Sequence, residues 1–218
     1  MRKLMTGILL AAALPASASI TSELNAGGSA ADVIAQAITA CGGSASCQEL
    51  AIAEAVTAGV DITTAVNLAI SAGVPAAKAV ASASEAGLKA GQSVESVMTA
   101  ALAVDGVSQA DAVQGVTQGA VDSGTAVADV MSAAQDSGVA QSTVVEGASK
   151  SSASESLITV AADKAGFSPE NVLAGTAAAK TGNTATGNTN TGNTNTNQNN
   201  NTNNPPAQTT TTGISASE

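Results

Sequence analysis

The sequence predicts an all-α fold: a right-handed-type α-solenoid or stack of about ten short Ala-rich helices, followed by a disordered tail. Two observations carry this prediction. Apolar residues recur at helical spacing in segments of ten or so residues, and a glycine interrupts the chain after most of these segments. In addition, parts of the chain resemble one another at a fixed offset.

The apolar spacing is clearest at Val94, Val97, Met98, Ala101 and Leu102, which occupy one face of a helix. The same spacing recurs near the start, the middle and the end of the region. It predicts helices near 30–40, 48–58, 62–72, 76–86, 93–104, 109–121, 125–136, 141–151, 155–165 and 169–179.

The breaks follow a common pattern, in which a glycine is followed by an apolar residue and then by a residue that starts a helix. Glycine adopts the left-handed conformation beyond a helix end without a steric penalty, and the apolar residue packs back on that helix. Asp61, Pro75, Ser108 and Ser168 are the expected starters. The predicted helix-break glycines are Gly59, Gly73, Gly87, Gly106, Gly124, Gly138 and Gly166.

Internal repetition supports the stack. Gly59, Gly73 and Gly87 are 14 residues apart, and the Val-x-x-Val-Met pattern at 94–98 returns 33 residues later at 127–131. The larger offset is typical of stacked helical hairpins. It resembles that of tetratricopeptide and ankyrin repeats, but their signature residues are absent, so the prediction concerns the architecture alone. A disordered low-complexity chain and a β-helix are the competing interpretations.

The two ends have different compositions. Residues 1–18 have the basic start, short apolar core and Ala16-Ser17-Ala18 cleavage site of a signal peptide, with 19–28 expected to form an N-terminal linker. The short-helix repeat domain is expected over 29–180. Residues 181–218 are rich in Asn and Thr and predict a disordered tail, which could act as a spacer or promote self-association.

Cys41 and Cys47 are the chain's two cysteines. In an oxidising compartment such a pair favours a disulfide between neighbouring helices. A zinc site would need further ligands, and a redox pair has a shorter spacing. The sequence therefore predicts a structural disulfide.

Composition argues against several function classes. Removal of residues 1–18 would delete Arg2 and Lys3 and take the net charge from −10 to −12, which disfavours binding to nucleic acid. The chain has no His, Trp or Tyr and only one Phe, Phe167, which we expect to be a buried plug. Histidine is the most common residue in acid–base catalysis, and aromatic residues dominate ligand pockets. We predict no catalytic residue, no cofactor-binding residue and no metal ligand.

Two sets of residues are possible sites. Lys150 beside Ser151 could form a Ser-Lys pair, and Asp122, Asp129 and Asp136 could share a calcium ion. Serine is too abundant for the first to be specific, and the acids lack the alternate spacing of a calcium loop. We interpret both as ordinary surface residues.

Together these features predict an exported non-enzymatic structural or protein-interaction protein of the bacterial envelope or extracellular matrix. The expected location is periplasmic, cell-surface or extracellular. The expected partner is another protein or a second copy of the chain, without nucleic acid, a stable membrane span or a small-molecule ligand. The alternatives are a membrane-active or pore-forming helical protein, and an ice- or surface-binding protein.

Overall fold

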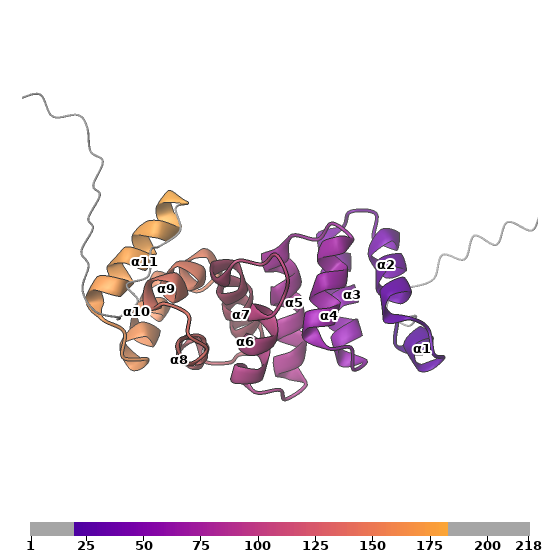
Figure 1. Ribbon diagram of the computed structural model, residues 1–218, viewed down its shortest axis with the longest axis horizontal. Helices are drawn as coiled ribbons and strands as arrows, with labels where there is room; N and C mark the ends of the chain where they lie inside the picture. The colour runs from indigo at the N-terminus through magenta and orange to yellow at the C-terminus, as the bar shows by residue number, and fades with distance from the viewer. Residues whose placement is uncertain (1–19, 183–218) are drawn as a thin grey trace, which may run out of the picture.

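The computed structural model describes residues 20–182, and all regular secondary structure in that range is helical (Figure 1). The all-α stack is confirmed, while the predicted signal peptide and residues 183–218 of the predicted tail lie outside the described range. The helices are α1 (Ile20–Asn25), α2 (Ala30–Ala40), α3 (Ala45–Thr57), α4 (Ile62–Ser71), α5 (Ala76–Lys89), α6 (Val94–Leu102), α7 (Gln109–Ser123), α8 (Val127–Asp136), α9 (Gln141–Lys150), α10 (Glu155–Lys164) and α11 (Pro169–Thr181).

The helices form two rows that run along the long axis of the molecule, with α1 and α11 at opposite ends (Figure 1). The even-numbered helices contact one another in the order α2, α4, α6, α8 and α10. The odd-numbered helices do so in the order α3, α5, α7, α9 and α11. Even-numbered helices begin at residues 30, 62, 94, 127 and 155, so the repeating unit is a pair of helices of 28 to 33 residues.

Glycine ends most helices as the sequence predicts. At Gly59 the backbone has φ 96°, the Val60 N–H donates to the Ala55 carbonyl at 3.0 Å, and the Gly59 N–H donates to the Val56 carbonyl at 3.0 Å. This pair of bonds is the Schellman arrangement, which satisfies carbonyls that the helix leaves free. Equivalent pairs form at Gly73, Gly124, Gly138 and Gly166.

Two of the predicted break glycines behave differently. Gly87 lies inside α5, which continues to Lys89, and Gly91 with φ 85° ends that helix instead. Gly87 is a buried residue of that helix, and a Cβ at its position would lie 2.8 Å from Cδ1 of Ile62. Gly106 has φ 75°, but it lies in a turn beyond Ala103, the residue that caps α6.

The N-terminal linker expected over residues 19–28 is corrected by the structure, because Ile20–Asn25 form helix α1. Ile20 is 1% exposed, and α1 packs against both α2 and α3. Burial of Ile20, with Leu24 partly buried against the core, stabilises a helix that is too short to be stable alone. The segment therefore closes the N-terminal end of the stack.

The core lies between the two rows and consists mainly of Val, Ile, Met and Ala. Val97 and Met98 on α6 are fully buried, as are Val130 and Met131 at the equivalent places on α8. Each such side chain stabilises the fold by about 1.5–3 kcal/mol when it is removed from water. The 33-residue sequence match thus corresponds to two equivalent core layers.

Glycines inside the odd-numbered helices allow that row to pack closely. A Cβ on Gly115 would lie 2.6 Å from Cβ of Val80, and a Cβ on Gly119 would lie 2.7 Å from the backbone nitrogen of Glu85. Gly147 and Gly175 approach their neighbouring helices equally closely. The backbones of neighbouring odd-numbered helices are therefore in close contact, as in other helix pairs that have small residues at the interface.

The predicted disulfide is present. Cys41 caps the end of α2, Cys47 lies in the first turn of α3, and their sulfur atoms are bonded. The bond closes the short loop between the two helices and fixes how α3 leaves α2.

We expect removal of this bond by the double substitution C41S/C47S to act locally. A ring this small contributes about 2 kcal/mol in the chain-entropy description. Because each unit of the stack contacts only its neighbours, the loss of stability should be confined to α1–α3. Hydrogen exchange should become faster in α2 and α3, while protection of α7 to α9 stays unchanged. Equal loss of protection along the whole chain would contradict this expectation.

Candidate functional site

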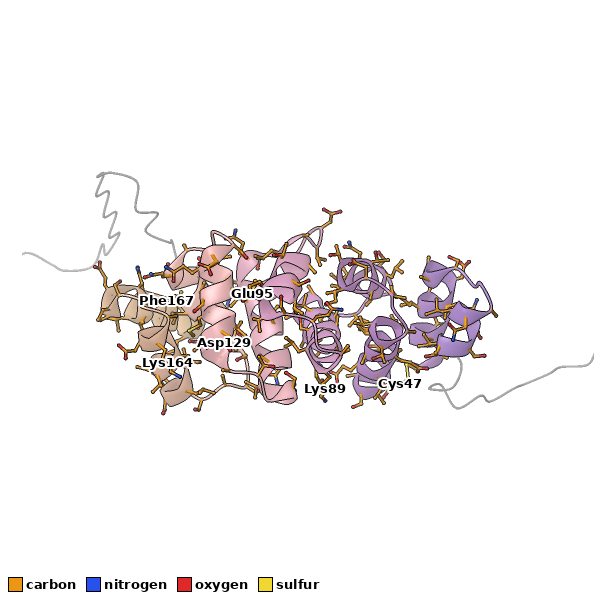
Figure 2. All side chains as sticks on the ribbon, turned by 90° about the horizontal axis from the view of Figure 1, so that it is seen from below. Cys47, Lys89, Glu95, Asp129, Lys164 and Phe167 are labelled. Atoms are coloured by element: carbon orange, nitrogen blue, oxygen red, sulfur yellow. A yellow bond between two sulfur atoms is a disulfide. The ribbon has the colours of Figure 1, made fainter. Side chains whose placement is uncertain are left out.

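A groove of about 820 Å³ crosses the odd-numbered row over α3, α5 and α7. We call it the row groove. Figure 2 labels Lys89, at its edge on α5, and Cys47, in the first turn of α3. Three successive repeating units therefore contribute to one surface.

Each helix contributes one face to the row groove. On α3 the lining residues Ser46, Glu49, Leu50, Ala53 and Thr57 follow helical spacing. On α5 and α7 the same spacing holds for the residues Ala77, Lys78, Ala81, Ser82, Glu85, Ala86, Lys89, Gln114, Gln118 and Asp122. The opposite faces of these helices supply Val56, Val80 and Val113 to the core.

Alanine makes the floor of the row groove hollow. Ala53, Ala77, Ala81 and Ala86 all line it, and none has an atom beyond Cβ. Leu50 is the one large apolar residue of the lining, and its side chain is 68% exposed on the wall formed by α3. An apolar side chain from another molecule could therefore enter over the alanines and contact Leu50.

The polar rim is held by local contacts. Glu85 and Lys89 form an ion pair one turn apart on α5. The Gln118 amide donates to the Asp122 carboxylate at 2.8 Å, and its carbonyl accepts from the Ser152 N–H at 2.8 Å. Because Ser152 follows α9, these bonds tie the α7 wall to the next repeating unit.

The rim carries charges of both signs, namely those of Glu49, Glu85, Asp122, Lys78 and Lys89. This is a more balanced mixture than in the N-terminal part of the chain, where residues 20–77 contain five acids and no basic residue. Mixed charge at the edge of an apolar floor suits a protein surface better than a polyanion.

One carboxylate outside the groove has a shifted pKa. Hydrogen bonds from its own backbone N–H and from the Ser93 side chain lower the pKa of Glu95, at the start of α6. The group is fully exposed and belongs to the cap of that helix, since the Ser93 hydroxyl also accepts from the Ser96 N–H at 3.2 Å. Its role is in helix capping.

The possible sites weighed from the sequence are dispersed in the structure. Asp122 lies on α7 at the row groove, whereas Asp129 and Asp136 are exposed on α8. Lys150 pairs with the buried carboxylate of Glu146 at 2.6 Å. Within residues 20–182, no three His, Cys, Asp or Glu side chains lie close enough together to hold a metal ion.

Phe167 is 6% exposed and belongs to the core cluster, as expected of a buried plug. The row groove is not predictable from the apolar periodicity of the sequence, because that periodicity marks the buried faces of the helices. The signal was present in Leu50, a large aliphatic residue on the otherwise small and polar outer face of α3.

None of the helices between residues 20 and 182 combines the length and the apolar character needed to cross a membrane. The chain matches no known protein-family model and no curated protein sequence.

Proposed function

We propose that this chain is a non-enzymatic scaffold of the bacterial envelope or extracellular matrix that binds a segment of another protein in the row groove. The observation that carries the proposal is the groove of about 820 Å³ across three repeating units, with Leu50 exposed at its wall. Extended surfaces of this kind are what helical solenoids use for binding.

The chemistry of the groove suggests the kind of partner. Its alanine floor leaves space for aliphatic or aromatic side chains, and its rim offers two lysines and three acids for polar contacts at the edge. A helix or an extended segment with two or three large apolar residues on one side would fit these features.

A role outside the cytoplasm rests on two features. The Cys41–Cys47 disulfide is typical of oxidising compartments, and residues 1–18 have the sequence pattern of a cleaved signal. The amino-terminal sequence of the protein purified from its host tests the export proposal directly. Recovery of chains beginning at Ser19 is the expected result, and recovery of intact Met1 chains alone would contradict it.

Site-specific photo-crosslinking in the native host tests the binding proposal. A photoreactive residue at Leu50 should give an adduct with one protein species. The same group at Thr99, an exposed residue of α6 in the other row, should not. Ala53→Trp fills the groove beside Leu50 and should abolish the adduct while helical circular dichroism is retained. Equal labelling at Leu50 and Thr99, or labelling that survives Ala53→Trp, would overturn the proposal.

A further inference from the structure

The two ends of the stack are closed differently. At the N-terminal end, α1 covers α2 and α3 and buries Ile20. At the other end α11 packs against α9, and no further helix of the described chain covers its outer side. Solenoids need polar caps at their ends, because an end without one leaves apolar surface in water.

The uncovered end carries an apolar projection and a hollow side by side. Leu173 on α11 is 73% exposed, and helical spacing places it on the side of α11 opposite Gly175, which faces α9. Leu173 also lines the edge of a hollow of about 450 Å³ between α10 and α11, together with Phe167, Pro169 and Val172. Figure 2 shows Phe167 near this end of the molecule. We call Leu173 and this hollow the end face.

The outer side of α11 presents small residues around Leu173. Ala174 and Ala177 flank Leu173, and both are exposed. Small residues are what permit α5, α7, α9 and α11 to approach one another closely. The alanines on the outer side of α11 likewise leave room for a helix to pack there.

The charges of the end face are also compatible with an identical surface. Glu155, Asp163 and Lys180 border the hollow, and Lys180 lies 3.5 Å from Glu155 within the same chain. Residues 155–182 contain three acids and two lysines, whereas residues 20–154 contain 13 acids and three lysines. Two copies that meet at this end avoid most of the like-charge repulsion expected elsewhere.

The composition of the chain's own C-terminal segment is poorly suited to occupying the hollow of the end face. Residues 183–218 follow α11 in the sequence, but Ile214 is their one large aliphatic side chain, and they contain no aromatic residue. A hollow lined by Phe167, Val172 and Pro169 is matched better by a leucine presented on a helix.

We propose that the end face binds the end face of a second copy of this chain. A projection beside a hollow is complementary to itself under two-fold symmetry, so Leu173 of each copy enters the hollow of the other. The α11 helices of the two copies then lie against each other through the same face. One helix face per copy buries less than about 1,200 Å², which places the dimer among weak and transient interfaces. The row groove takes no part in this contact.

Sedimentation equilibrium of the processed full-length chain, from micromolar to submillimolar concentration, tests the proposal. The wild type should rise toward twice the monomer mass, and Leu173→Glu should stay monomeric. Leu50→Glu is the matched control, since Leu50 is similarly exposed at the row groove, and this variant should dimerise as the wild type does. Circular dichroism confirms that each variant is folded.

Truncation after Gly182 separates the remaining possibilities. The truncated chain should dimerise as the full-length chain does. A full-length chain that stays monomeric, with dimers only after truncation, would assign the end face to residues 183–218 and overturn the proposal. A Leu173→Glu variant that dimerises like the wild type would also overturn it. Loss of the Leu50 crosslinking adduct with intact dimerisation would count against the proposed scaffold function alone.

Discussion

Gly147→Ala is expected to lower the free energy of unfolding by about 2 kcal/mol, although alanine is the better helix former. In an exposed helix the change would gain roughly 1 kcal/mol. Here the added methyl group would lie 2.5 Å from the carbonyl oxygen of Ala110 and 2.8 Å from Cβ of Val113 on α7. Backbone cannot move aside as a side chain can, so α9 must separate from α7, and overpacking of this kind costs about 3 kcal/mol.

Urea denaturation monitored by circular dichroism measures this loss, and Gly87→Ala is the matched control. Gly87 is also a buried helical glycine, but its closest neighbour is the terminal Cδ1 of Ile62, which can rotate away. We expect the control to change stability by less than about 1 kcal/mol, since the helix-propensity gain offsets the rearrangement. If Gly147→Ala and Gly87→Ala were equally stable, this result would contradict the close contact between α7 and α9.

Met131→Ala is expected to lower the free energy of unfolding by about 3 kcal/mol. Met131 is fully buried on α8 in the core between the rows. Truncation removes its apolar contacts and leaves a cavity, which together cost about 2–5 kcal/mol for a Met-to-Ala change. Met98 occupies the equivalent place on α6, so Met98→Ala should give a loss of similar size.

Two control substitutions accompany this prediction: one preserves the side-chain volume at position 131, and the other truncates an exposed side chain. Met131→Leu preserves the volume and should cost less than about 1.5 kcal/mol. Leu50→Ala removes a large aliphatic side chain that is 68% exposed and should change stability by less than about 0.5 kcal/mol. A loss at Met131→Ala no greater than that at Leu50→Ala would contradict burial of this methionine between the rows.

Helix positions follow closely from the sequence, because local interactions control where these helices begin and end. Helix α2 spans Ala30–Ala40 as predicted, and the Asp61 side chain caps α4 by accepting from the Thr64 N–H at 3.2 Å. The prediction that Gly87 ends a helix is wrong, because this glycine lies inside α5. A glycine that ends a helix and a glycine that lets two helices touch look alike in sequence, and only the tertiary contact with Ile62 distinguishes them.

The sequence by itself determined the helical repeats, the Cys41–Cys47 pairing and the buried position of Phe167, because each depends on local spacing or on strong hydrophobicity. The tertiary structure alone decided that the helices form two rows, that α3, α5 and α7 share a groove, and that Leu173 is left uncovered at one end. Periodicity shows which side of a helix is apolar, but not which helix lies against it. That choice depends on distant residues such as Gly147 and Val113, whose close contact no local pattern encodes.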